Sequence, residues 1–121
     1  WSEDLKLFAA TLETNPASWK AMHNYASALD DRGRTAEGER LMREVIALRP
    51  DSAEAFNDLA VMVWQLGRRE EAAALMRQSL VLRPTPGSAR NLAVMEEQLG
   101  NPAGQAEALQ LLRQLEQNAA P

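Results

Sequence analysis

With 121 residues, the chain is long enough for one ordinary domain. Hydrophobic residues make up 45% and charged residues 25%, and good helix formers dominate, so we expect an almost entirely α-helical fold. The net charge of −4 argues against an electrostatically driven nucleic-acid binder, the lack of cysteine excludes disulfides and thiolate metal sites, and no apolar run approaches the roughly 20 residues of a membrane span.

Apolar residues at helical spacing predict the helices in chain order. The first, over about residues 1–15, ends before Pro16, because proline disfavours helical geometry in the residue before it. Its apolar face comprises Trp1, Leu5, Phe8, Ala9 and Leu12. Since the chain opens inside this predicted helix, we expect it to be a piece cut from a longer protein.

The next two helices are predicted from about Ala17 to Asp31 and from Thr35 to Leu48. Gly33 separates them, because glycine readily adopts the left-handed conformation that ends a helix. Thr35 is the predicted N-cap of the second of these helices.

The stretch 53–84 predicts two further helices that meet at Gly67. Asp51 is the predicted cap of the first, with Glu54 three residues later completing a capping box. Pro86 fits the start of the following helix, where its missing N–H group costs nothing.

The last helix follows Gly100, with Asn101 and Pro102 as a possible cap and first residue. Its apolar pattern is clear from Ala106 onward. We expect the tail, residues 117–121, to fray.

The sequence also repeats with a period of 34 residues. Pro16, Pro50 and Pro84 keep this spacing, and Leu-Arg-Pro recurs at 48–50 and 82–84. A third copy follows with one residue lost. Small residues recur where two helices must approach closely, at Ala26, Ala60 and Ala93 on first helices and at Gly38 and Ala72 on second helices. Such a period predicts stacked helical hairpins.

Small residues, large apolar residues, Gly and Pro thus recur at fixed positions of a 34-residue unit. In this pattern the chain resembles the tetratricopeptide repeat family. The resemblance implies an all-α fold, a right-handed α-solenoid of tandem helix-turn-helix hairpins with the first helices on the concave face. It divides the chain into the second helix of an incomplete repeat (1–16), repeats at 17–52 and 53–86, a degenerate C-terminal repeat or capping hairpin (87–118) and a frayed tail (119–121).

The chain departs from the family pattern at two positions. Gly38 stands where the family favours Ala, and Glu96 stands where the other copies have Leu29 and Val63. Glu96 predicts a last hairpin that is less tightly enclosed than the others.

The resemblance implies a non-catalytic protein-protein interaction scaffold that binds a peptide or helix in the concave groove, with no cofactor, no metal and no nucleic acid. The predicted groove residues lie on the outer side of the first helices. They are Lys20, His23, Asn24, Ser27, Asp31, Asn57, Asp58, Val61, Trp64, Gln65, Arg90, Asn91, Val94, Glu97 and Gln98.

Two binding patterns known in the family can be compared with this groove. In the pattern that holds a terminal carboxylate, His23 and Ser27 stand where Lys and Asn are needed. Glu54 and Asp58 would also repel the carboxylate, so we reject that pattern. The second pattern is the asparagine ladder of the glycosyltransferase that modifies Ser and Thr with N-acetylglucosamine. At the repeat position that carries this asparagine, the present chain has Asn24 and Asn91 in two repeats and Asp58 in the repeat between them.

Single residues leave alternatives open. Trp64 either anchors a partner in the groove or packs against the next hairpin. Trp19 is expected to close the start of its hairpin, and Trp1 to pack within the first helix.

His23 has Asp30 and Asp31 about two turns away, too far for a metal site or a catalytic dyad, so we interpret it as a solvated polar residue. Residues 68–71 form a charge cluster interpreted as a solvated face, and no motif supports an enzyme.

Two other roles remain open from the sequence. One is a structural or self-assembly module that pairs through Leu5, Phe8 and Leu12. The other is an accessory domain of a larger membrane-bound protein, because residues 1–16 resemble the junction after the last span of polytopic proteins with these repeats, some of which are glycosyltransferase-like. In that case the module is tethered and extracytoplasmic. A free cytoplasmic adaptor is the alternative, so the sequence leaves the compartment and the partner unidentified.

Overall fold

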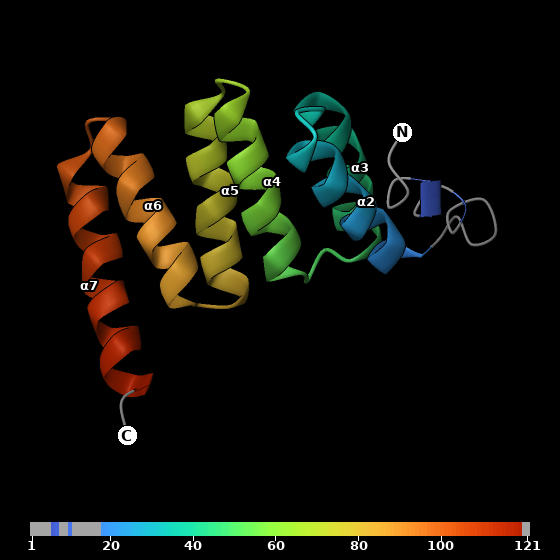
Figure 1. The fold of residues 1–121 in the computed structure, drawn as a ribbon. Helices are drawn as coiled ribbons and strands as arrows, with labels where there is room; N and C mark the ends of the chain where they lie inside the picture. The colour runs from blue at the N-terminus through green and yellow to red at the C-terminus, as the bar shows by residue number, and fades with distance from the viewer. Residues whose placement is uncertain (1–5, 8–9, 11–17, 120–121) are drawn as a thin grey trace.

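The structure, a computed structural model, describes residues 6–7, 10 and 18–119. Residues 18–119 form six α-helices, labelled in Figure 1 as α2 (Trp19–Asp31), α3 (Thr35–Leu48), α4 (Ala53–Gln65), α5 (Arg69–Leu82), α6 (Pro86–Gln98) and α7 (Pro102–Ala119). None of the helices in this part of the chain is long and apolar enough to cross a membrane.

The predicted first helix falls mostly outside the described residues. Residues 6, 7 and 10 are helical. The apolar face predicted at Trp1, Leu5, Phe8, Ala9 and Leu12 lies outside the described part, as does Pro16, so self-assembly through this face stays a prediction.

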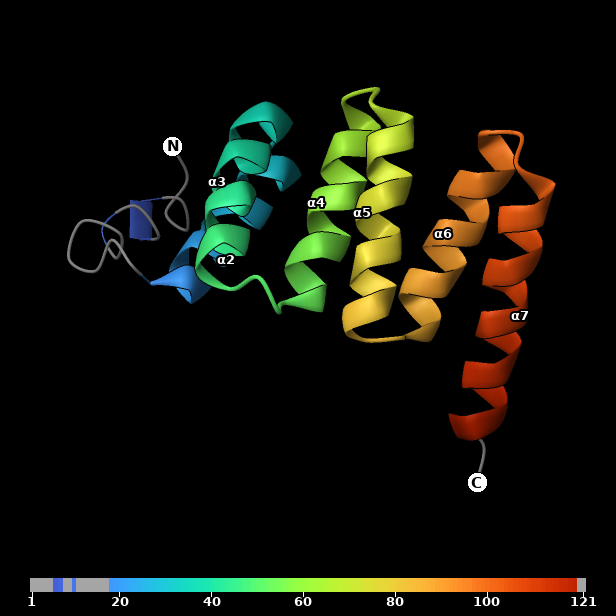
Figure 2. The ribbon, with the colours of Figure 1, turned by 180° about the vertical axis from the view of Figure 1, so that it is seen from behind.

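The helices form three hairpins that stand in a row, α2–α3, α4–α5 and α6–α7 (Figures 1 and 2). The second helix of one hairpin packs on the first helix of the next, α3 on α4 and α5 on α6, and α2 also touches α4 directly. Because each hairpin buries its apolar face against its neighbours, the core runs along the stack. The predicted all-α solenoid is confirmed.

A hydroxyl side chain caps the start of each first helix. The Oγ of Ser18 accepts from the N–H of Ala21 at 3.3 Å, and the Oγ of Ser52 accepts from the N–H of Ala55 at 3.2 Å. Thr85 does the same for α6, a cap that was not predicted. Pro86 is the first residue of that helix, at its start as predicted. Each cap satisfies one N–H group that the helix leaves without a partner.

Two predicted caps are wrong. Ser52, not Asp51, caps α4, and the carboxylate of Asp51 instead accepts from Arg49 Nε at 3.1 Å. Thr35 is the first residue of α3, and its hydroxyl donates to the Oδ1 of Asp30 at 2.8 Å. The residue before it, Arg34, stands at the N-cap position without a side-chain cap hydrogen bond.

The turn inside every hairpin has a glycine with positive φ, +81° at Gly33, +92° at Gly67 and +72° at Gly100. In each turn the next N–H donates back to a carbonyl five residues earlier, for example from Arg34 to Leu29 at 2.8 Å. This is the helix-ending geometry that favours glycine, so the prediction at Gly33 and Gly67 is confirmed.

The last helix begins as predicted. The Oδ1 of Asn101 accepts from the N–H of Gly104 at 3.2 Å, and Pro102 is the first helical residue. The helix continues to Ala119, beyond Gln117, and residues 120–121 lie outside the described part.

Small residues allow the helices to approach closely, as predicted. Ala26, Ala60 and Ala93 are buried on first helices, and Gly38 and Ala72 are buried on second helices. A Cβ atom added at Gly38 would lie 2.8 Å from the carbonyl oxygen of Ala26. At this crossing the backbone of α2 therefore leaves no room on α3 for the alanine that the family favours.

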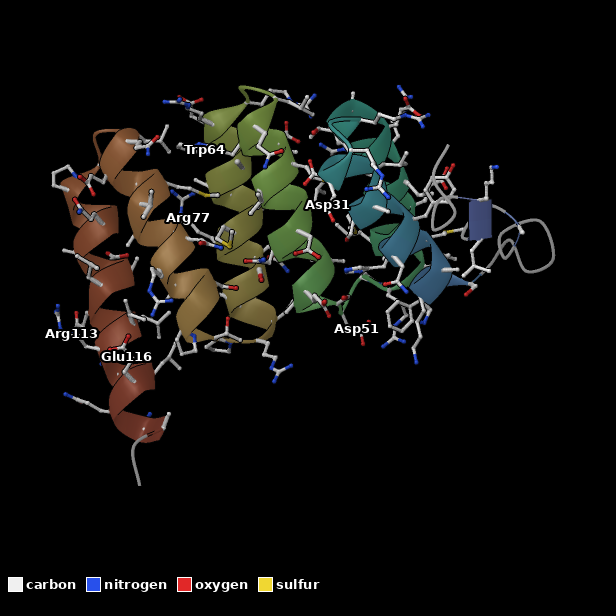
Figure 3. All side chains as sticks on the ribbon, viewed as in Figure 1. Asp31, Asp51, Trp64, Arg77, Arg113 and Glu116 are labelled. Carbon is white, nitrogen blue, oxygen red and sulfur yellow. The ribbon has the colours of Figure 1, made fainter. Side chains whose placement is uncertain are left out.

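The last hairpin is less enclosed than the others, as predicted, since α7 buries only Ala108, but Glu96 is not the reason. Its side chain is fully buried and accepts hydrogen bonds from Arg77 of α5 and from the side chain of Asn101. A Cβ atom at Gly104 would overlap the Glu96 carboxylate, so the absence of a side chain there makes room for it. Figure 3 shows Arg77 directed from α5 toward α6. A buried carboxylate thus ties α5, α6 and the start of α7 together.

A second charged cluster joins α3 to α5. Glu39 is largely buried and accepts from Arg43, at 2.8 Å and 3.0 Å, and from Arg68. Arg43 also donates to Glu71 at 2.6 Å. Residues 68–71 are exposed as predicted, but two of them take part in an ion-pair network between hairpins rather than forming only a solvated face.

Candidate functional site

The residues predicted to line a groove lie on α2, α4 and α6, the first helices of the three hairpins. We call the surface that they form the first-helix surface. Lys20, Asn24, Asp31, Gln65, Arg90, Val94, Glu97 and Gln98 are exposed, whereas His23 is buried and Ser27, Asn57, Asp58, Val61, Trp64 and Asn91 are partly buried.

Four of these polar side chains, together with Ser88 of α6, form a hydrogen-bonded chain across the first-helix surface, which we call the polar ladder. On α6, Ser88 Oγ and Asn91 Nδ2 donate to the Oδ1 of Asn57, at 3.0 Å and 3.4 Å. Asn57 Nδ2 lies 3.3 Å from the Oδ1 of Asp58, and Asp58 Oδ2 lies 2.9 Å from the Nε2 of His23 on α2. The polar ladder therefore links the first helices of all three hairpins.

His23 corrects the interpretation as a solvated residue. It is 8% exposed, and its acidic neighbours come from α4 rather than from its own helix. The hydrogen bond to Asp58 raises the pKa of the His23 imidazole, burial opposes this, and the charges of Asp58 and Glu54 raise it further. The two carboxylates therefore stabilise positive charge at the His23 ring, whether it comes from a proton or from a bound cation.

Metal-ligand side chains also gather at this point. Nε2 of His23 lies 3.7 Å from the Oε1 of Glu54, and one ligand atom from each of His23, Glu54 and Asp58 lies within 4.8 Å of the other two. The sequence prediction missed this group because it considered only the acids on the same helix as His23. Asn57 is the position equivalent to His23 in the next repeat, 34 residues later. This spacing could have predicted that His23 lies near Asp58, the neighbour of Asn57.

A shallow hollow of about 190 Å³ opens between α2 and α4. It is lined by Ser27, Asp30, Asp31, Asp58, Val61 and Met62. Figure 3 places Asp31 between these two helices. The hollow gives this part of the first-helix surface an acidic character.

Trp64 is partly buried and packs against the core. The guanidinium carbon of Arg69 lies 4.8 Å from the centre of its ring, a cation–π contact across the α4–α5 turn. Figure 3 shows Trp64 near that turn. Its role as a partner anchor stays a prediction, and the ring already contributes to the packing of its own hairpin.

Two residues of α6 turn toward α7. Arg90 pairs with Glu116 at 3.4 Å, and Gln105 donates to Glu97 at 3.4 Å. These contacts are exposed and contribute little to stability. Arg90 and Glu97 therefore lie at the α7 edge of the first-helix surface.

Comparison with known proteins places the chain among repeat proteins. A family profile described as tetratricopeptide repeat matches residues 26–89, just over half of the chain. No curated protein sequence matches the chain significantly.

Solved structures of MamA have the same fold. MamA from Desulfovibrio magneticus RS-1 superimposes with a TM-score of 0.89 at 18% identity, covering 97% of this chain and 67% of that one. Another MamA crystal structure gives 0.86 at 14% identity, with 95% and 68% covered, and MamA AMB-1 gives 0.81 at 21%, with 96% and 64% covered. The chain spans about two thirds of these proteins, and the likeness concerns the fold alone.

Proposed function

Because this chain belongs to the tetratricopeptide repeat family, we propose that it is a non-catalytic interaction module that binds a peptide segment of a partner protein on its first-helix surface. Repeats of this kind, and the fold shared with MamA, fit a scaffold role. The observation that carries the finer proposal is the polar ladder, because it crosses all three hairpins on one surface.

The chemistry of the polar ladder suits the main chain of an extended peptide. An asparagine side chain offers two N–H donors and a carbonyl acceptor, the same groups that a peptide main chain presents. Asn24 is exposed next to the buried His23, and Asn91 is partly buried. The internal hydrogen bonds of the ladder hold Asn57 and Asn91 in fixed positions, which lowers the entropy cost of binding.

The charge of this surface selects against one class of partner. Glu54, Asp58 and Asp31 would repel a terminal carboxylate brought close to them. We therefore propose an internal segment of the partner, not its C-terminus, as the bound element.

The test begins with peptides selected from a random display library on the immobilised domain, followed by fluorescence anisotropy with the best peptide. Asn24→Ala and Asn91→Ala should each weaken binding about 2- to 12-fold, the effect of losing one hydrogen bond worth about 0.5–1.5 kcal/mol. Asn24→Ala should melt close to the wild-type temperature, because the Asn24 side chain is exposed. Asn91→Ala should melt at a slightly lower temperature, because it also loses its hydrogen bond to Asn57.

The matched control is Glu44→Ala, an exposed substitution on α3, a second helix. It should leave the affinity unchanged. Equal loss of affinity in all three variants, or none in the two asparagine variants, would contradict binding on the first-helix surface.

A further inference from the structure

His23, Glu54 and Asp58 combine features that a metal site requires. His23 comes from α2, whereas Glu54 and Asp58 stand four residues apart on α4. Residues at this spacing lie on the same face of a helix, one turn apart. Zinc sites built on helices use this arrangement, in which one helix supplies two ligands four residues apart and another element supplies the third.

The two distances from the His23 nitrogen are close to those of a small tetrahedral centre. Zinc–nitrogen and zinc–oxygen bonds of about 2.0–2.1 Å place the ligand atoms about 3.3 Å from one another. Here Nε2 of His23 lies 2.9 Å from Asp58 Oδ2 and 3.7 Å from Glu54 Oε1. Shifts of about 0.4 Å in each of these two distances would give that spacing. The carboxylate oxygens of Glu54 and Asp58 lie within 4.8 Å of each other, and the Glu54 side chain, 80% exposed, is free to move toward the ion.

The surroundings also fit a divalent ion. Two carboxylates balance its charge while the imidazole supplies a nitrogen ligand, a set that suits zinc and its neighbours rather than calcium or magnesium. The side chain of His23 is 10% exposed, which holds its ring in place. The side-chain amide of Asn57 donates to Asp58 Oδ1, the oxygen that faces away from the proposed ion. Hydrogen bonds of this kind orient the ligands in metal sites.

We propose that His23, Glu54 and Asp58 bind a divalent transition-metal ion, with Zn²⁺ as the occupant and a fourth position open to water or to a partner's side chain. The ion bridges α2 and α4, which otherwise touch at few points. Its binding therefore joins two consecutive hairpins and stabilises their relative arrangement. This proposal does not depend on the proposed function.

Isothermal titration calorimetry of the tag-free domain with ZnCl₂ tests the site, together with thermal melts at increasing Zn²⁺. The wild type should bind one Zn²⁺ per chain and melt at a higher temperature with it, because an ion that binds only the folded state stabilises it. Co²⁺ should replace Zn²⁺ and give the visible absorption of a tetrahedral centre.

Glu54→Gln is the decisive variant, since an exposed side chain can change without harm to the fold. It should leave the melting temperature of the metal-free domain unchanged and weaken Zn²⁺ binding about tenfold or more. Loss of a residue that only hydrogen-bonds to a metal ligand already lowers metal affinity about 10- to 100-fold, and Glu54 is proposed as a ligand itself. His23→Gln should abolish the Co²⁺ spectrum. Asp31→Asn, a matched exposed acid on the same surface, should bind as the wild type does.

Any one of the following results would overturn the proposal. They are no heat of Zn²⁺ binding to the wild type, unchanged binding in Glu54→Gln, and binding of Mg²⁺ or Ca²⁺ as tight as that of Zn²⁺. The last of these, or an equal loss in Asp31→Asn, would show only a general attraction of cations to an acidic surface.

Discussion

Replacement of Glu96 by leucine tests how the last hairpin is held. Glu96 is fully buried, and its carboxylate depends on Arg77 and Asn101 for partners. The equivalent positions of the other hairpins have buried apolar residues, Leu29 and Val63. Glu96→Leu removes a buried charge and restores the apolar column. Arg77, half exposed, and Asn101, exposed, can both turn to water.

The magnitudes follow from the burial. Replacement of buried ion pairs by apolar residues is often neutral or stabilising by about 1–4 kcal/mol. Because a second partner, Asn101, is also lost and leucine is slightly larger than glutamate, we expect Glu96→Leu to add from 0 to about 2 kcal/mol to the free energy of unfolding. Arg77→Ala should instead remove about 2–3 kcal/mol, less than the 3–5 kcal/mol of a fully buried pair, because Arg77 reaches solvent.

Urea unfolding followed by circular dichroism measures both variants and the double variant. In the Glu96→Leu background, Arg77→Ala should cost less than about 0.5 kcal/mol, since its partner is gone. A loss of more than about 2 kcal/mol in Glu96→Leu would refute the reasoning. So would an Arg77→Ala that costs the same in both backgrounds.

Two further predictions concern the packing and the charges. Gly38→Ala should lower the free energy of unfolding by about 1–3 kcal/mol, since the new Cβ meets the Ala26 carbonyl. Gly87→Ala, where nothing lies within 4 Å, should raise it by a few tenths up to about 1 kcal/mol in the same urea titrations, and equal effects would argue against the close helix crossing. Burial of Glu39 raises its pKa, but the hydrogen bonds from Arg43 and Arg68 outweigh this and lower the pKa below the ordinary value of 4.5. Its stabilising effect should therefore be full above pH 4.5 and disappear as the pH falls through the lowered pKa, so the stability difference between wild type and Glu39→Gln should shrink from pH 6 to pH 3, and a constant difference would contradict the pairing.

The repeated pattern explains why the fold could be predicted from the sequence. Two features of the repeat have local causes and are found as expected. Gly33 and Gly67 adopt the positive φ that ends a helix, and the alanines that recur at one position of each first helix are buried where helices cross. The caps were harder, because Asp51 and Ser52 are both good capping residues. In the structure Ser52 caps α4 while Asp51 pairs with Arg49, a choice between neighbouring residues that the sequence alone does not reveal.

The site was less predictable because it depends on contacts between hairpins. Asn57 and Asn91 were placed on the correct surface by their register, but their hydrogen bond was not foreseen. The environments of His23 and Glu96 were misjudged for a common reason. Each buried polar group finds its partners on another helix, 35 residues away for His23 and Asp58, and only the packed structure brings them together.

The most direct measurement of the central proposal is a ¹⁵N chemical-shift titration of the domain with its best selected peptide. Binding on the first-helix surface predicts the largest shifts in α2, α4 and α6, including the side-chain amides of Asn24, Asn57 and Asn91. Shifts confined to the outward faces of α3, α5 and α7, for example around the exposed Val81, with those amides unmoved, would contradict the proposal.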